Sequence, residues 1–357
     1  MKDVIVYPYS NYFTPFLRQM AYDKKYSILS AVIPGKWCFE GIDASFLDEG
    51  SIIGIPISTD FDEQLNYCSI VIWAEYDYTD NAVFFNHVLS QMKYAILVKK
   101  DIVCCQKLSP GVLSQFKELA KQNDVNFEYI FEDSSEIFHN GNNIITIPII
   151  TIMGIGENCS KFETQLILRR LFIESGYQFS QIGSRPGCEL LGFHSFPDFM
   201  FNKQYTETEK ISAFHEFIYN IQQKERKDFI ILGIPGGIMP YDEKHVNYYG
   251  ITCYEVFSSI KTDFNILNVW NQDLNKEFMQ TLSNIMKYKF SATLDCVGIS
   301  NINLIIRNRL NNDIEYCILD KRTIRASAND NLTVRTYNIL EENDQISMLD
   351  QILKKLS

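Results

Sequence analysis

Short apolar runs alternate with amphipathic segments along the first 140 residues. The apolar runs have the length and β-branched content of buried strands, at residues 4–7, 27–33, 52–57, 69–74, 95–98 and 127–131. Apolar side chains recur at helical spacing over 82–92 and 109–122, and Ser109-Pro110 is a helix-start signal. Buried strands that alternate with helices predict a mainly parallel α/β sheet.

The same alternation resumes after a polar stretch, SSEIFHNGNN at 134–143, where we place a domain boundary. We therefore expect domains at 1–140 and 141–357. The second domain is predicted to be another mainly parallel sheet flanked by helices. Its strands are expected at 144–153, 178–182, 228–234, 265–269, 295–298, 304–307 and 316–319, and its helices at 161–175, 208–224 and 348–356.

Composition narrows the class of protein. A chain of 357 residues, 46% apolar and 22% charged, is long enough for two folded domains. Its net charge of −11 argues against a nucleic-acid or anionic-membrane surface. No apolar run could span a bilayer and the N-terminus lacks a signal-peptide pattern, so we expect a cytoplasmic location. The nine cysteines are scattered without zinc or iron–sulfur spacing, which predicts no metal centre.

The segment 144–173 contains the strongest functional signal. An apolar strand leads into GIGENCSK at 154–161 and then into an amphipathic helix. This is the strand–loop–helix layout of a phosphate-binding loop, in which backbone N–H groups and a helix N-terminus surround an anion. The spacing is one residue longer than G-x-x-x-x-G-K-[ST], with Ser160 at the second glycine and Phe162 at the metal-binding hydroxyl. We expect Ser160 to fit a helix N-terminus without strain.

Two further turns are predicted to lie at the same sheet edge, because ligands sit at the carboxyl ends of parallel strands. GSRPGCE at 183–189 follows one strand, and Arg185 can hold a phosphate or a carboxylate. ILGIPGG ends a second strand but carries Gly233 where a metal-organising acid is usual. The predicted binding residues are Gly154, Gly156, Glu157, Asn158, Cys159, Ser160, Lys161, Phe162, Gly236 and Gly237, and the candidate catalytic residues are Lys161 and Arg185.

The sequence is compatible with two interpretations of the loop at 154–161. The loop is either a site for ATP or another phosphorylated ligand, or a plain turn with a solvated Lys161. Because oxygen ligands are missing at Phe162 and Gly233, Mg²⁺-dependent hydrolysis is less favoured than binding. A helix N-terminus can lower a thiol pKa, but we assign Cys159 as a small side chain that fills the loop.

GIGENCSK together with ILGIPGG resembles the dethiobiotin-synthetase-type branch of P-loop proteins. The two-domain layout is similar to the D-glutamate N-acetyltransferase-like family. The segments IPIITIMGIGENCSKFETQLILRR, YQFSQIGSRPGCELLGF and DFIILGIPGGIMP most closely resemble the clostridial peptide-maturation-system family, sharply only over about 144–240. This resemblance implies a Rossmann-like N-terminal domain and a P-loop NTPase-like C-terminal domain. It also implies a precursor peptide and a radical-SAM maturase as partners.

Three functions are compatible with the sequence. The first is an accessory protein of ribosomal-peptide maturation that binds a nucleotide at 154–162. Any chemistry there would be ATP-dependent activation or group transfer, with Lys161 as phosphate clamp and Arg185 as orienting cation. The second is a degenerate P-loop scaffold that binds the precursor peptide or the maturase. The third is an acyl- or amino-acid transferase whose loop holds the phosphate of a coenzyme A-like donor. A homo-oligomer is compatible with all three.

Overall fold

Two separate parallel sheets organise the chain, one in each of two units. The computed structural model describes residues 2–35, 39–76, 82–131, 143–242, 246–272, 274–307, 313–320, 324 and 334–357. The first unit comprises Met1–Asp133 with Glu189–Gly192, and the second comprises Ser134–Cys188 with Phe193–Ser357. The predicted junction between residues 140 and 141 lies outside the described residues.

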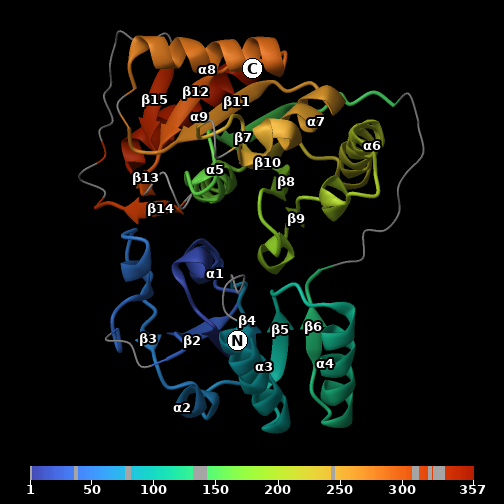
Figure 1. Ribbon diagram of the computed structural model, residues 1–357, viewed down its shortest axis with the longest axis vertical. Coiled ribbons are helices and arrows are strands. Elements are labelled where there is room, and N and C mark those ends of the chain that lie inside the picture. Colours follow the sequence, from blue (N-terminus) through green and yellow to red (C-terminus); the bar gives the residue numbers. More distant parts are fainter. Residues whose placement is uncertain are drawn as a thin grey trace. The chain divides into compact units, whose positions relative to one another are not determined.

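The first unit has a six-stranded sheet in the order β3-β2-β1-β4-β5-β6 (Figure 1). All of its strand pairs are parallel, with Val4 of β1 opposite Ile70 of β4. This is the strand order of Rossmann folds, with β1 and β4 at the point where the order reverses. Its elements are β1 (Asp3–Tyr7), η1 (Asn11–Phe13), α1 (Thr14–Asp23), β2 (Ser27–Val32), η2 (Ala44–Leu47), β3 (Ile57–Ser58), α2 (Phe61–Leu65), β4 (Ile70–Trp73), α3 (Ala82–Leu97), β5 (Asp101–Cys104), α4 (Pro110–Gln122) and β6 (Phe127–Tyr129).

Two strand predictions in this unit were wrong. The apolar run at 95–98 is the end of α3, and the strand that follows it is β5. A run of four apolar residues has the same pattern in a buried helix end as in a buried strand, so periodicity cannot separate them. The run at 52–57 contributes only Ile57 to the two-residue strand β3, and Ile52 is 84% exposed.

The second unit has a seven-stranded sheet in the order β15-β12-β11-β7-β10-β8-β9. Every pair in it is parallel, with Ile149 of β7 opposite Ile230 of β10. Its elements are β7 (Ile149–Gly154), α5 (Lys161–Glu174), β8 (Phe179–Gly183), β9 (His194–Ser195), η4 (Asp198–Phe201), α6 (Glu207–Glu225), β10 (Phe229–Gly237), η5 (Asn247–Gly250), α7 (Ile251–Ser259), β11 (Phe264–Val269), α8 (Lys276–Lys289), β12 (Cys296–Ile299), β15 (Arg335–Asn338) and α9 (Glu342–Leu356). A short helical turn, η3 (Cys188–Leu191), spans the point where the chain passes from one unit to the other.

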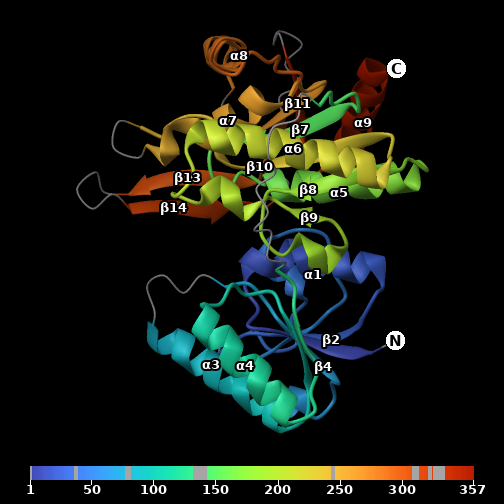
Figure 2. The same cartoon turned by 90° about the vertical axis from the view of Figure 1, so that its right-hand side faces the viewer.

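Helices cover both faces of this second sheet (Figure 2). One core joins Ile149 and Met153 of β7 to α6, α7 and α8, and another joins Ile150 and Ile152 to α5 and α9. Successive strand residues point to opposite faces, so a strand buried on both faces is largely apolar, as β7 is apart from Thr151. A separate antiparallel hairpin, β13 (Ile302–Arg307) with β14 (Asp313–Ile318), packs Leu304 and Tyr316 against the first of these cores. The fold class predicted from the sequence is therefore confirmed.

Sequence periodicity missed α7, α8 and β15 in this unit.

Among the described residues, none of the helices is both long and apolar enough to cross a membrane.

Candidate functional site

The loop 155–160 connects the end of β7 to the start of α5, and its base is fixed by the two neighbouring strands. The N–H of Ile155 donates to the carbonyl oxygen of Asn268 at 2.8 Å, and the N–H of Ile238 donates to that of Gly154 at 3.1 Å. Because β7, β8, β10 and β11 are parallel, the turns that follow them meet at one edge of the sheet. The loop therefore lies where open α/β sheets bind ligands.

The loop backbone holds two residues in the left-handed conformation. Asn158 has φ of 48° and Ser160 has φ of 56°. The expectation that Ser160 sits without strain was wrong, because this conformation costs an L-residue roughly 1–2 kcal/mol. The backbone N–H groups of Asn158, Cys159, Ser160 and Lys161 make no hydrogen bond within the part of the chain that the structure describes. A run of unbonded N–H groups through left-handed turns is the geometry of an anion-binding nest.

Lys161 is 6% exposed, so its side chain is not solvated as the plain-turn alternative supposed. Its Nζ lies 2.8 Å from Oε2 of Glu157, 3.0 Å from the carbonyl oxygen of Gly236 and 3.3 Å from that of Gly156. An ammonium has three protons, and these acceptors account for them. Burial by itself would lower the pKa of Lys161, but neighbouring groups, the Glu157 carboxylate first among them, together outweigh it and the pKa is raised. The ammonium is thus held charged at the base of the loop.

Two glycines of the loop are required by close contacts. A Cβ on Gly154 would lie 2.4 Å from Sγ of Cys159, and one on Gly156 would lie 2.3 Å from a ring carbon of Tyr241 and 2.5 Å from Trp270. Cys159 is fully buried, and burial raises the pKa of its thiol to about 11. The thiol is therefore neutral and fills the loop, as the sequence predicted.

Aromatic side chains that sequence reasoning missed support the crest of the loop. The N–H of Glu157 donates to the hydroxyl of Tyr241 at 2.9 Å, and Nε1 of Trp270 donates to the carbonyl oxygen of Glu157 at 3.0 Å. The rings of Tyr241 and Trp270 lie 5.3 Å apart, and the Tyr241 hydroxyl is 3.3 Å from that of Tyr316. Trp270 directly follows a strand, which is the one sequence signal for its position.

A second residue that sequence reasoning missed is Asn268, near the end of β11. Its Nδ2 donates to Oγ1 of Thr164 at 2.7 Å and to the carbonyl oxygen of Ser160 at 3.2 Å. These bonds fix the first turn of α5 against the neighbouring strand. The available signal was an asparagine in a strand whose other residues, apart from Asn265, are apolar, because buried polar groups need partners.

The other predicted residues also lie at this edge. Gly236 and Gly237 end β10, where the carbonyl oxygen of Gly236 accepts from Lys161 and Gly237 pairs with Gly154. Arg185 follows β8, and its guanidinium carbon lies 5.3 Å from the centre of the Phe162 ring. The structure thus brings the loop, the glycine turn and Arg185 together.

The residues at this edge do not fit the usual Mg²⁺ site of a P-loop. Phe162 presents a ring where a hydroxyl would bind the metal. A Cβ on Gly233 would lie 2.1 Å from Oε1 of Gln165, so the side chain of Gln165 occupies the space that an acid would need. Among the described residues, no group of three or more histidine, cysteine, aspartate or glutamate side chains could hold a metal ion.

Comparison with solved structures finds a likeness that runs over most of the chain. A DUF1611 family protein from Anabaena variabilis superposes with a TM-score of 0.60 at 10% identity, over 84% of this chain and 87% of that chain. At this identity the likeness shows a shared fold alone. No family model matches the chain, and no curated protein matches it.

Two other solved structures match more weakly. A nucleotide-binding protein in complex with ADP from Archaeoglobus fulgidus has a TM-score of 0.27 at 7% identity, over 58% of this chain and 86% of that one. A homoserine dehydrogenase from S. aureus has a TM-score of 0.25 at 13% identity, over 36% of this chain and 32% of that one. Superpositions this poor carry no argument about the ligand, and the resemblance to peptide-maturation proteins stays a prediction.

Proposed function

We propose that the second unit binds the phosphate groups of a nucleotide, with ATP as the first candidate, at the loop 154–162. The observation that supports this most is the buried Lys161 ammonium at the base of the loop, where the N–H groups from Asn158 to Lys161 have no hydrogen-bond partner among the described residues. The backbone nest and the start of α5 favour an anion, and Lys161 adds a full positive charge. Strain at Ser160 supports the same proposal, because strained backbone concentrates at functional sites.

Binding is the activity that these side chains support, and hydrolysis is not part of the proposal. Phe162 and Gly233 offer no side-chain oxygen to a metal. A phosphate held at this edge would contact the loop N–H groups and Lys161. We further propose that the protein serves ribosomal-peptide maturation. The support for that role is the resemblance of the segments around 154–161, 178–194 and 228–240.

Isothermal titration calorimetry tests the binding proposal. ATP, GTP and coenzyme A are titrated in turn into the full chain, each with Mg²⁺ and with EDTA. We expect heat with at least one of them, and we expect Lys161→Ala to weaken binding at least tenfold, since charge-assisted hydrogen bonds are lost. Lys203→Ala, on an exposed side chain of the same unit, is the matched control and should bind as the wild type does.

The three ligands separate the alternatives. Binding of coenzyme A in preference to both nucleotides would favour the acyl- or amino-acid-transferring function. No heat with any ligand, or heat that Lys161→Ala leaves unchanged, would leave only a scaffold. For the proposed role in a pathway, a Cys-rich precursor peptide should bind the full chain in the same calorimeter. Absence of binding by such a peptide would remove the support for that role without touching the nucleotide proposal.

A further inference from the structure

Phe162, the residue after Lys161, cannot bind a metal, and a guanidinium group lies over the face of its ring. Phe162 is 3% exposed, and the guanidinium of Arg185 lies over its ring. In P-loops this position supplies a hydroxyl to Mg²⁺, which in turn neutralises phosphate charge. The structure therefore places a fixed organic cation beside the position that serves the metal elsewhere.

Hydrogen bonds fix the loop that carries Arg185 to the first turn of α5. The N–H of Ser184 donates to Oε1 of Gln165 at 3.1 Å, and Nε2 of Gln165 donates to Oγ of Ser184 at 2.8 Å. The same Nε2 donates to the carbonyl oxygen of Lys161 at 3.0 Å. All three residues are buried. Gln165 thus sets the distance between the residue before Arg185 and the lysine of the phosphate loop.

The far side of the same loop is fixed as well. Sγ of Cys188 bonds to the carbonyl oxygen of Arg185 at 3.1 Å, and a Cβ on Gly183 would lie 2.2 Å from that sulfur. Packing against Gly183 and the bonds from Gln165 leave the backbone at Arg185 little freedom. A guanidinium on such a support is preorganised, which makes its contact with an anion more favourable.

We propose that Arg185 replaces the divalent cation, so that this site takes a pyrophosphate-bearing nucleotide free of Mg²⁺. This inference rests on the proposed function. The planar fork of a guanidinium donates two parallel hydrogen bonds to phosphate oxygens, which an ammonium cannot do. The Phe162 ring contacts the cation through a cation–π interaction. Gln165, which fills the space beside Gly233, also excludes the acid that a metal would require.

Calorimetry with ADP as the probe tests the inference on the full chain, in EDTA and in excess MgCl₂. We expect the wild type to bind in EDTA at least as tightly as in Mg²⁺. Arg185→Ala should weaken binding in EDTA about tenfold or more, and Arg185→Lys should recover only part of the loss. Phe162→Leu keeps the site apolar but removes the ring, and should weaken binding about two- to fivefold. Arg335→Ala removes an equal charge from an exposed position of the same unit and should change nothing.

The binding measurements distinguish a wrong role for Arg185 from the absence of a phosphate site at the loop. If Lys161→Ala abolishes binding while Arg185→Ala binds as the wild type does, the loop is a phosphate site and the role given to Arg185 is wrong. A wild type that binds ADP only with Mg²⁺ overturns the inference in the same way. No binding by the wild type in either buffer overturns both proposals. Circular dichroism and thermal melting of each variant identify any loss of binding that is due to unfolding.

Discussion

Nζ of Lys161 lies 2.8 Å from Oε2 of Glu157, four residues earlier in the loop 155–160. The two side chains differ in solvent exposure, which is 8% for the lysine and 52% for the glutamate. Hydrogen bonds to Tyr241 and Trp270 fix the backbone of Glu157, but its exposed carboxylate can move away from Lys161. A phosphate that reaches Lys161 must displace this carboxylate.

We therefore expect Glu157→Gln to tighten the binding of ADP. A half-exposed ion pair is worth up to about 1 kcal/mol, so its removal should lower the dissociation constant roughly fivefold. Calorimetry of the variant in EDTA measures the change. Glu277→Gln, at an exposed position in the first turn of α8, is the control for loss of negative charge. Equal or weaker binding by Glu157→Gln would mean that the carboxylate does not compete with the ligand.

The raised pKa of Lys161 predicts a loss of stability in alkali. The pKa of an unfolded lysine is about 10.4, and in the folded chain Glu157 raises it despite burial. Stability from the charged lysine is fully present below the unfolded pKa and is lost as the pH rises through the folded one. Denaturant unfolding from pH 8 to pH 12 should show the free-energy difference between wild type and Lys161→Met constant at first and smaller above about pH 10.4. A difference that stays constant to the alkaline end would contradict the assignment.

Gly156→Ala should disrupt the crest of the loop. The added methyl group would meet the rings of Tyr241 and Trp270 at under 3 Å, so both must move. Overpacking of this kind costs about 1–3 kcal/mol, and it should also weaken ADP binding because it shifts the backbone that carries the nest. Thermal melting and calorimetry measure the two effects.

The matched control for this substitution is Gly111→Ala in α4. A Cβ at Gly111 meets nothing within 4 Å, and alanine is the better helix former. That variant should be as stable as the wild type or up to about 1 kcal/mol more stable, with ADP binding unchanged. Similar losses in the two variants would show that the contacts at Gly156 are not the cause.

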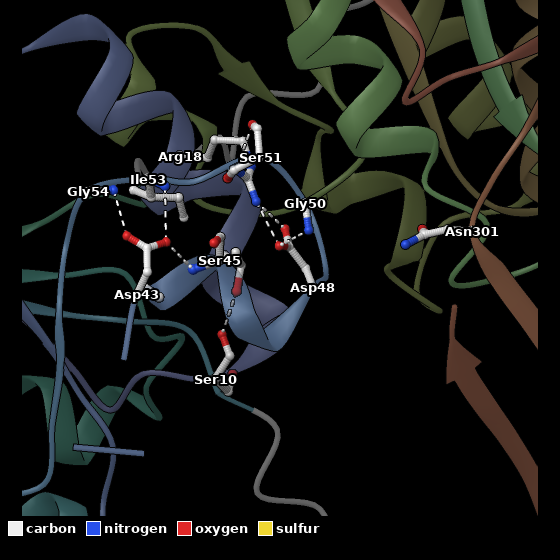
Figure 3. Close-up of polar contacts among 12 residues, drawn as sticks. Ser10, Arg18, Asp43, Ser45, Asp48, Gly50, Ser51, Ile53, Gly54 and Asn301 are labelled. Atoms are coloured by element: carbon white, nitrogen blue, oxygen red, sulfur yellow. Dashed lines mark hydrogen bonds and ion pairs between the residues drawn. The ribbon is translucent and has the colours of Figure 1, made fainter. Parts of the chain in front are cut away.

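Asp43 in the first unit predicts a loss of stability in acid. Its carboxylate accepts hydrogen bonds from the backbone N–H groups of Ser45, Ile53 and Gly54, at 2.7 to 3.1 Å (Figure 3). Burial alone would raise its pKa, but the side chain of Ser45 and these backbone bonds together outweigh it and lower the pKa to about 2. The stability that they give is present above the unfolded pKa of about 3.9 and is lost as the pH falls through the folded pKa.

We expect Asp43→Asn to lower the free energy of unfolding by about 1–2 kcal/mol at neutral pH, since bonds to a charged acceptor become bonds to a neutral one. The difference from wild type should shrink as the pH falls from 4 towards 2. Urea unfolding at several pH values measures it. Glu118→Gln, on an exposed face of α4, should show no comparable difference. A deficit in Asp43→Asn that does not change with pH would point to a shape effect instead.

The sequence by itself determined the elements whose pattern is long and regular. Local sequence patterns predicted the apolar strand β7, the helices α4 and α5, and the glycine-rich turn between β7 and α5. Each of these patterns depends only on residues close together in the chain. The same local signals placed the loop 155–160, Arg185 and the glycine turn of β10 at the carboxyl ends of strands. The four-residue run at 95–98 was too short for its period to be read, and it proved to be helical.

Only the tertiary structure decided how the loop is held. Asn268 bonds to Ser160 across 108 residues, and Trp270 bonds to Glu157 across 113. These pairs meet because β11 lies beside β7, and no local pattern encodes which strands are neighbours. The left-handed backbone of Ser160 has the same origin, since bonds to its carbonyl and packing around it maintain a conformation that serine alone disfavours. The loop's position is thus a property of the sequence, whereas the unbonded N–H groups and the buried charge of Lys161 arise from contacts made by distant residues.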